Sequence, residues 1–396
     1  MNKSKFLKRA CLAAAVGLIP VSQATMAGDV SISGWINEDV IYYDDGNGSD
    51  IFQASGNDTT LGSRITFAGS TDLPAGLSAG FEVITEYNDV AGSSLAFTQA
   101  TASDNTGLYQ GVTFLGHSVY LSGGFGKVTV GLLTTPTDNI AVLGDPSLTL
   151  WSSNGVVFRG PSMVIQNTTG ALAGTAWGTF LQCQTLNGAG IGLDCNGIYR
   201  NGVRYDLPTF IDNVTLAVGW SNDDIYDVAG TWSGDLGRTK ANLRLGYAVN
   251  NGVNTATYDQ TDLFQVQGGI MDPVTGLFGT IAYQNEDANK RAGALATASD
   301  GSDVYWLKVG IKKAFNSLGD TSLAFQYGSY NDQYGATAGV TGSEVERIGF
   351  SVDQYFGSSL ILYGSYENFN LNASTTAAAA EGSDLNLFSL GLTYFF

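Results

Sequence analysis

The sequence predicts an all-β fold, namely a closed antiparallel barrel of sixteen strands that spans a membrane. Three observations lead to this prediction. Apolar residues alternate with polar or small ones in many segments, and no segment sustains a helical period of 3.6 residues. Long and short connections alternate between these segments. The last ten residues, 387–396, form one more strand with an apolar face.

The segment 243–249 illustrates the alternation. One face of it holds Leu243, Leu245, Tyr247 and Val249, and the opposite face holds Arg244, Gly246 and Ala248. Successive side chains of a strand point to opposite faces of its sheet, so this pattern indicates a strand with one apolar face. A soluble β-sandwich would show the same alternation, so the period alone does not establish a membrane protein.

Sixteen segments fit this description. From the N-terminus, we expect strands at 29–43, 60–71, 76–88, 117–124, 126–134, 198–207, 213–221, 226–233, 239–250, 260–271, 276–285, 302–316, 320–331, 344–356, 359–369 and 384–396. Sixteen strands of about ten residues each are typical of a mid-sized membrane barrel.

The connections favour a membrane barrel over a sandwich. Every second connection is a short turn, such as "DLPAG", "GGFG", "DPVTG" or "NSLGD", and the others are long and polar, except a short one near 222–225. Membrane barrels have tight periplasmic turns and long outer loops. An even strand number places both termini on the periplasmic side, and the last strand must pair with the first because no edge can stay open in lipid.

Residues 1–27 have the pattern of a secretory signal peptide. Four cations precede the apolar stretch 10–21, and small residues follow it up to Ala27. The alternative, a helical membrane anchor, would need about 20 apolar residues. We therefore expect the exported chain to comprise residues 28–396, folded as one barrel domain.

The exported chain is strongly acidic. Removing residues 1–27, with four cations and no acid, changes the formal net charge from −18 to −22. Such a charge disfavours nucleic acid as a partner. Cys183 and Cys195 are expected to form a disulfide, because exported chains meet an oxidising compartment. A metal site is disfavoured by the cysteine spacing and by the presence of a single histidine, His117.

At this point the chain resembles the sixteen-stranded general porins of Gram-negative outer membranes, especially the alphaproteobacterial kind. The resemblance rests on "GDVSISGW", "SRITFAGSTDLPAGLSAGFEV", "VYLSGGFGKVTVG", "NGVRYDLPTF", "GFSVDQYFG" and the final "LGLTYFF". It implies a homotrimer of water-filled pores in the outer membrane, with outer-membrane lipid, lipopolysaccharide, periplasmic chaperones and the barrel-assembly machinery as partners. It also implies that the third loop folds into each barrel and narrows it.

The interval 135–197 is where that third loop belongs, and it is much longer than a hairpin loop needs. We expect it to fold inward, although a solvated excursion on the outer surface is the alternative. Cys183 and Cys195 lie in its returning limb, where a disulfide would stiffen it.

Strand parity predicts which charges face the lumen. The inward cations are Arg64, Lys127, Arg200, Arg204, Arg244, Lys308, Lys312 and Arg347, and Glu82 and Glu86 also point inward. The third loop adds Asp138 and Asp145 early and Arg159 and Asp194 later. Charges on the lipid face near the midplane would cost about 2–4 kcal/mol, which supports this assignment.

The resemblance implies that basic wall residues face acidic loop residues across the narrowest point. Arg64 corresponds to the wall, and Asp138 and Asp145 to the loop. This chain departs from many relatives at 130–133, where "VGLL" replaces a segment containing arginine. Together with the net charge, this predicts weak cation selectivity. The same charged residues could instead form lumen salt bridges that hold the loop in place.

Tyrosines near the predicted strand ends indicate aromatic girdles at the two membrane interfaces. Trp35 and Trp306 point inward by parity and could alternatively belong to a sugar-guiding track. Phe396 is expected at the periplasmic interface beside the first strand. The resemblance implies that this terminal aromatic is read by the outer-membrane insertion machinery.

Several functions remain to be compared. Passive diffusion of ions and small hydrophilic solutes is the preferred one, and a channel specific for a sugar or an anionic nutrient is the alternative. A soluble adhesin would have the same acidity. An enzyme is disfavoured because a Ser/His site would depend on His117 alone. No cofactor is expected, although the acidic loop 43–50 could bind calcium.

Overall fold

The computed structural model describes residues 29–55, 61–87, 112–167, 170–183, 191–252, 258–290, 300–333, 340–375, 380–381 and 383–396. The expected signal peptide at 1–27 lies outside the described residues. In the described part of the chain, no helix is long and apolar enough to cross a membrane.

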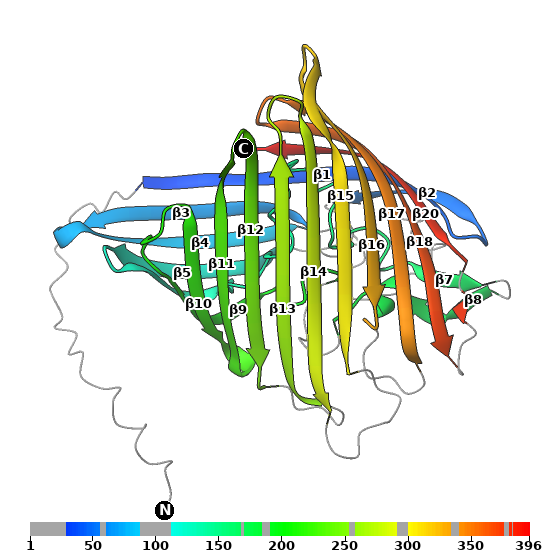
Figure 1. Ribbon diagram of the computed structural model, residues 1–396, viewed down its shortest axis with the longest axis horizontal. Helices are drawn as coiled ribbons and strands as arrows, with labels where there is room; N and C mark the ends of the chain where they lie inside the picture. Colours follow the sequence, from blue (N-terminus) through cyan, green and yellow to red (C-terminus); the bar gives the residue numbers. More distant parts are fainter. Residues whose placement is uncertain are drawn as a thin grey trace, which may run out of the picture.

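The structure is a closed antiparallel barrel with sixteen strand positions in its wall (Figure 1). Its strands are β1 (Asp29–Asp44), β2 (Ser49–Ser55), β3 (Ser63–Leu73), β4 (Leu77–Tyr87), β5 (Thr113–Gly123), β6 (Gly126–Thr134), β9 (Tyr199–Asp206), β10 (Val214–Ser221), β11 (Ile225–Leu236), β12 (Thr239–Asn250), β13 (Tyr258–Met271), β14 (Leu277–Lys290), β15 (Gly301–Asn316), β16 (Gly319–Asn331), β17 (Val340–Phe356), β18 (Leu360–Thr375) and β20 (Leu385–Phe395). The predicted fold class is therefore confirmed.

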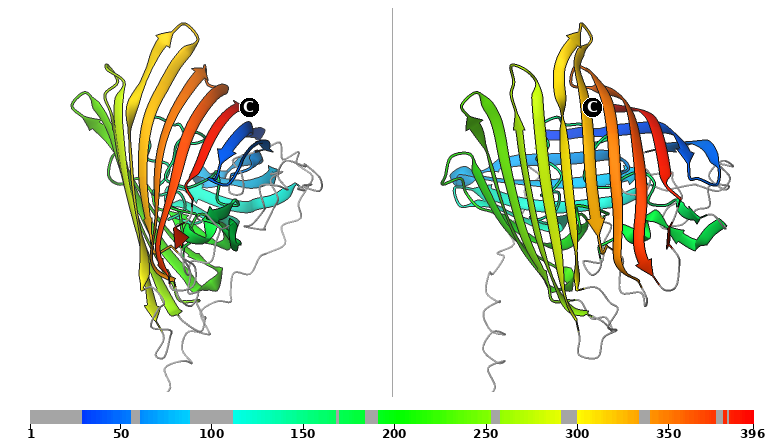
Figure 2. Two further views of the ribbon diagram at one scale, coloured as in Figure 1. Left: turned by 90° about the vertical axis from the view of Figure 1, so that its right-hand side faces the viewer. Right: turned by 45° about the vertical axis from the view of Figure 1, so that its right-hand side comes forward.

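Each strand pairs with its neighbour in sequence, and β20 closes the barrel by pairing with β1 from Trp35↔Phe395 to Asp44↔Asn386. The other edge of β1 pairs first with β3 and then, beyond Trp35, with β2. β2 and β3 therefore occupy one wall position between them. β1 and β3 to β5 run across the direction of β12 to β18 (Figures 1 and 2), as the strands of opposite walls do in a barrel with tilted strands.

Four short strands were not expected from the sequence. β2 lies in a polar, acidic stretch that resembles a loop, and β19 (Ala380–Glu381) extends the outer end of β18. β7 (Val164–Asn167) and β8 (Gly170–Ala176) form a separate hairpin within the long interval after β6. Short 3-10 turns occupy Pro74–Gly76, Trp177–Phe180 and Asn222–Asp224.

The two faces of the wall differ as strand parity predicts. Large apolar side chains such as Leu245, Phe350 and Leu390 are exposed on the outside. The main buried apolar cluster lies inside the barrel, where loop residues such as Val157, Met163 and Trp177 pack against inward residues such as Tyr330 and Phe369. The apolar residues therefore serve two environments, since the outer set meets lipid and the inner set anchors the loop.

The terminal residue helps to close the wall. The Phe396 amide donates to the Gly34 carbonyl at 3.2 Å, and the Gly34 amide donates to the Phe396 carbonyl at 3.0 Å. In β20 the side chains of Leu390 and Leu392 point outward, and those of Ser389 and Thr393 are buried inside. The last residue of the chain is thus hydrogen-bonded into the sheet through its backbone.

We predict that deletion of Phe396 lowers the yield of folded barrel, because it removes both backbone hydrogen bonds to Gly34 and the terminal aromatic side chain. Heat-modifiable gel migration of outer-membrane fractions measures the folded fraction. The variant Phe396→Tyr keeps both features and should assemble as the wild type does. Equal yields of the deletion variant and the wild type would contradict this prediction, and channels that do insert should conduct normally.

Candidate functional site in the barrel lumen

The lumen is bounded by the inward face of the wall and by the segment between β6 and β9. Each of the eight cations predicted to face inward lies on the face of its strand opposite to the exposed apolar side chains. They are Arg64, Lys127, Arg200, Arg204, Arg244, Lys308, Lys312 and Arg347. Glu82 and Glu86 lie on the same face of β4. The assignment of charges to the lumen face therefore agrees with the strand register.

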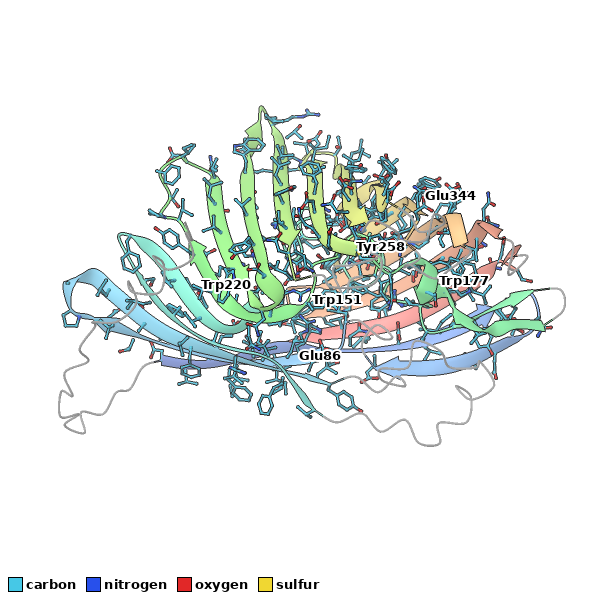
Figure 3. All side chains as sticks on the ribbon, turned by 90° about the horizontal axis from the view of Figure 1, so that it is seen from below. Glu86, Trp151, Trp177, Trp220, Tyr258 and Glu344 are labelled. Atoms are coloured by element: carbon cyan, nitrogen blue, oxygen red, sulfur yellow. A yellow bond between two sulfur atoms is a disulfide. The ribbon has the colours of Figure 1, made fainter. Side chains whose placement is uncertain are left out.

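Much of the described segment 135–197 lies inside the barrel, whereas its β7–β8 hairpin projects at the edge of the barrel (Figure 2). Hydrogen bonds join this third loop to inward side chains of β11, β13, β14, β15, β16, β17 and β1. Its Trp151, labelled in Figure 3, lies between the walls of the barrel. The Trp151 ring packs edge-on against Trp35 of β1 and Phe395 of β20, with ring centroids 5.9 and 5.1 Å apart. These contacts do not fit a solvated excursion on the outer surface.

Lys308 of β15 is the main cation beneath the loop. Its ammonium group lies 2.7 Å from an Asp145 carboxylate oxygen, donates to the Ser153 carbonyl at 2.8 Å, and contacts the Thr149 hydroxyl. The Lys308 side chain is fully buried and Asp145 is nearly so. A buried ammonium loses its hydration, so these three partners are needed to offset the cost of its burial.

Arg347 of β17 holds the next part of the loop. Its guanidinium donates to the carbonyls of Asn154 and Val156 and, at 3.0 Å, to the Gln326 side chain. Glu367 lies 3.6 Å away and supplies the opposite charge. Backbone carbonyls of the loop are thereby satisfied by wall side chains, which keeps an irregular segment stable inside the barrel.

A third ion pair connects the loop to the first strand. The Arg159 Nε atom lies 2.8 Å from an Asp39 carboxylate oxygen, and both side chains are buried. The Arg159 guanidinium also lies over the ring of Tyr363, 5.2 Å from its centre. The sequence placed Arg159 in the loop, but it gave no indication that Asp39, 120 residues away, is its partner.

These contacts change the expected role of several cations. Lys308, Arg347 and Arg200 were expected to line the constriction, but the loop covers all three and leaves them buried. Arg200 donates to the Asn196 side chain at 3.1 Å. The physical reason is that the loop packs directly on this wall, so the cations bind loop oxygens instead of facing water. Arg244 faces inward and is only partly buried.

A polar cavity of about 580 Å³ lies on the other side of the lumen, along β1, β3 to β6 and β9. It is lined by Glu82, Lys127, Arg204 and Asp206 together with hydroxyl groups such as those of Ser118 and Tyr120. The Arg204 guanidinium lies 2.8 Å from Asp206. Higher in this wall, Arg64 is 2.6 Å from Glu86 and lies over the Trp35 ring. Cations and acids therefore alternate along the part of the wall that the loop leaves uncovered.

The base of the loop carries two neighbouring acids, of which Asp194 is buried and Asp138 is half-buried. Asp138 lies beside Asp194, and the Asn139 amide donates to Asp194 at 3.1 Å. Burial and the neighbouring Asp194 carboxylate raise the pKa of Asp138 well above its usual range. Burial raises the pKa of Asp194 to about 7. Asp138 was expected to face Arg64 across the pore, and the structure places it at the base of the loop, within the electrostatic reach of Arg64 and Arg204.

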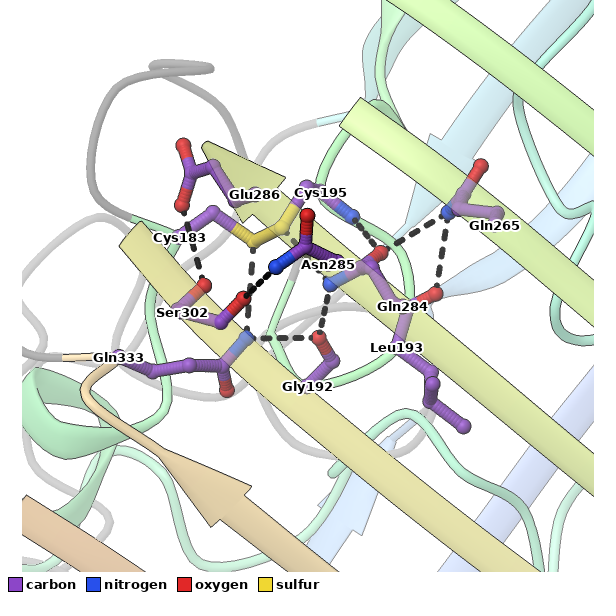
Figure 4. Close-up of a disulfide and its surroundings, with 10 residues drawn as sticks. All are labelled: Cys183, Gly192, Leu193, Cys195, Gln265, Gln284, Asn285, Glu286, Ser302 and Gln333. Carbon is purple, nitrogen blue, oxygen red and sulfur yellow. Dashed lines mark hydrogen bonds between the residues drawn. A yellow bond between two sulfur atoms is a disulfide. The ribbon is translucent and has the colours of Figure 1, made fainter. Parts of the chain in front are cut away.

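Cys183 and Cys195 are joined by a disulfide in the returning limb of the loop, with their Cα atoms 5.4 Å apart (Figure 4). The Gln284 amide bonds both to the Gly192 carbonyl and to the Cys195 sulfur, and Gln333 also donates to Gly192. Glu286 lies beside this pair. Since the two sulfur atoms are bonded to each other, they offer no thiolate to a metal ion.

Aromatic side chains form clusters on the outer face near the strand ends. The rings of Tyr366 and Tyr42 pack at a tilt against Phe388, with centroids 4.7 and 6.0 Å apart, and Tyr283 packs likewise against Tyr305 at 4.9 Å. Such clusters are typical of the girdles at a membrane interface. The inward Trp306 is almost fully buried and donates to Gln326, which is a packing role.

The comparisons with known proteins agree with this geometry. A family model for Gram-negative porins matches residues 10–374. The chain belongs to the Gram-negative porin family. It is thus an outer-membrane channel protein with a barrel fold. Among curated protein sequences, no match was found.

Solved structures with the same fold come from several bacteria. The anion-selective porin from Comamonas acidovorans has a TM-score of 0.59 and 18% identity, covering 93% of this chain and 100% of that one. OmpT, an outer membrane protein of Vibrio cholerae, has a TM-score of 0.54 and 13% identity, covering 94% and 99%. A mutant of Rh. blastica porin has a TM-score of 0.53 and 16% identity, covering 93% and 100%. At these identities the likeness establishes the fold alone.

We predict that Lys308→Met loosens the third loop of this porin, because Asp145 loses its cation in a buried site. Removing one partner of a buried ion pair typically costs about 3–5 kcal/mol. The expected results are a lower thermal midpoint of the barrel and greater open-channel current noise in planar bilayers. Lys313→Met, at an exposed position on the same strand, is the matched control. Equal midpoints and equal noise in the two variants would contradict this anchoring role.

We also predict that the stability of the porin falls as the pH rises from about 4 to 7. The pKa values of Asp138 and Asp194 are raised in the folded state above the value of about 3.9 in an unfolded chain. The folded state therefore binds more protons in this window, so a rise in pH favours unfolding. Asp138→Asn should flatten the dependence of the thermal midpoint on pH, whereas the exposed control Asp212→Asn should not. Equal slopes for wild type and Asp138→Asn would refute this account.

Proposed function

We propose that this porin is a general-diffusion channel that lets ions and small hydrophilic solutes cross the outer membrane passively. The observation that carries the proposal is the polar wall formed by β3 to β6 and the Arg204–Asp206 end of β9, most of which the third loop leaves uncovered. Inward hydroxyl and charged groups there can replace part of the hydration shell of a passing solute. No chemical step is needed, and the single histidine, His117, lies on the outward face of β5.

The proposed ion preference is weak and favours cations. The uncovered wall holds Arg64, Lys127 and Arg204 against Glu82, Glu86 and Asp206, so its local charges nearly cancel. The remaining bias comes from the whole exported chain, whose net charge of −22 attracts cations toward the channel mouths. The Comamonas acidovorans porin is described as anion-selective, and its 18% identity to this chain does not carry that property over.

We further propose that the porin works as a homotrimer in contact with outer-membrane lipid and lipopolysaccharide. A trimer form of the structurally similar Vibrio cholerae OmpT supports the oligomeric state. Delivery by periplasmic chaperones and insertion by the barrel-assembly machinery are part of the same proposal, and the paired terminal Phe396 supports it. Calcium binding in the loop 43–50 stays a prediction. In that loop the carboxylates of Asp44 and Asp45 accept backbone hydrogen bonds from Gly46 and Gly48.

The selectivity is tested by reversal potentials in planar bilayers under a KCl gradient. We predict a reversal potential with the sign of K⁺ preference and a small magnitude, because the lumen charges nearly balance. Glu82→Gln should shift it toward Cl⁻, and Lys127→Gln should shift it toward K⁺. A marked anion preference of the wild type would overturn the proposed selectivity, and an absence of KCl conductance would overturn the channel itself.

A further inference from the structure

A second cavity in the lumen has a different chemistry from the polar one. It has a volume of about 750 Å³ and lies between the loop segment 142–154 and the ends of β15, β17, β18 and β20 next to the short turns. Its lining is mainly apolar and includes Leu143, Leu148, Leu150, Trp151, Ile361 and Phe395. Cavities of about 300–1,000 Å³ with such a lining and a few polar groups are typical small-molecule sites.

Two leucines of the loop are exposed toward this cavity. Leu143 is 50% exposed and Leu148 is 64% exposed, although the loop buries many of its other apolar side chains. Apolar surface left in water carries a free-energy cost, which burial against an apolar ligand would remove. Leu148 also sits at a positive φ of 61°, which is unfavourable for a leucine and holds this turn in a defined conformation.

Lys312 of β15 provides the cavity with a positive charge. Its ammonium group donates to the Ser147 carbonyl at 2.8 Å and lies 3.7 Å from the centre of the Tyr355 ring. An ammonium group has three donors, and the structure shows no carboxylate within 4.0 Å of this one in the described part of the chain. Lys312 is therefore positioned to donate to an anionic group of a ligand.

Three carboxylates act on the Lys312 ammonium from beyond ion-pair distance, those of Asp320, Asp145 and Asp353, and Asp320 has the largest effect. Asp145 also borders the cavity, but its carboxylate is already paired with Lys308 at 2.7 Å and accepts from Ser147. Asp320 borders the cavity as the second residue of β16, and Asp353 of β17 is buried within the electrostatic reach of Lys308. The charged lining thus consists of one ammonium group and two carboxylates beside a large apolar surface, and of these three groups only the ammonium can donate directly to a ligand carboxylate.

We propose that this cavity binds small monocarboxylates with an aromatic or aliphatic body. The carboxylate would bind the Lys312 ammonium, and the body would pack against Leu143, Leu148 and Trp151. A sugar fits less well, because it needs several hydrogen-bond partners and the lining here is mainly apolar. The proposal rests on the channel function above, and it assigns to the porin a weak solute-binding site beside the periplasmic mouth.

The test uses the full-length porin in planar bilayers with benzoate as the probe. Benzoate is added to each side in turn, and block of the KCl current is measured against its concentration. We expect saturable block from the side of the short turns, weaker block by the uncharged isostere benzyl alcohol, and none by glucose. Lys312→Met should weaken benzoate block about tenfold or more, and it should leave the effect of benzyl alcohol unchanged.

A second variant and a control separate binding from folding. Leu148→Gln leaves Lys312 in place and should weaken block by both benzoate and benzyl alcohol. Lys240→Met removes an exposed cation near another short turn, where Lys240 pairs with Asp235 at 2.6 Å, and it should not change the block. A normal KCl current without saturable benzoate block, or a Lys312→Met block equal to that of the wild type, would overturn this site. A missing KCl current would instead overturn the channel function.

Discussion

Pairing of the backbone is the constraint on which the rest of this structure depends. Inside a membrane no water is available to N–H and C=O groups, so each strand must have a hydrogen-bonded neighbour on both edges. β1 meets this requirement with β20 along one edge and with β3 and then β2 along the other. Closure in turn divides the side chains into an outer apolar set and an inner polar set. The charges of the chain are thereby gathered into a small enclosed volume.

The inward charged and polar side chains hold the third loop in position. A long irregular segment has many backbone groups to satisfy, and the inner wall supplies partners in Lys308, Arg347 and the glutamines Gln265 and Gln284. The loop in turn neutralises the cations, through Asp145 for Lys308. Wall and loop are therefore mutually dependent, since each buries polar groups that the other satisfies.

Anchoring the loop on one side makes the lumen asymmetric. The wall from β11 to β18 is covered, whereas the wall formed by β3 to β6 and the Arg204–Asp206 end of β9 keeps polar side chains open to a cavity. Beneath the loop, the apolar cavity around Leu148 and Lys312 forms a third environment. One barrel thus offers a charge-balanced polar surface for hydrated solutes and a separate apolar surface with a single ammonium group.

The sequence by itself determined the fold class, fifteen of the sixteen wall positions, the shared lumen face of the cations, and the outward face of Leu390 and Leu392. These features follow from local rules, because a period of two residues fixes the side of the sheet on which a side chain lies. Most strand ends were predicted to within three residues, but β14 and β18 continue five and six residues beyond their predicted ends. At the second wall position, which β2 and β3 share, the sequence predicted only the β3 part, because β2 has the composition of a loop. The alternation along a strand does not predict which residues contact each inward side chain.

Only the tertiary structure decided whether an inward charge faces water or protein. Arg64 and Lys308 have the same parity, yet one remains partly exposed at the open wall and the other is buried beneath Asp145. Likewise, Arg159 meets Asp39 and Asp138 meets Asp194 because the loop crosses the lumen along one particular path. That path depends on the simultaneous packing of residues far apart in sequence, and such long-range contacts leave no periodic signal in the chain itself.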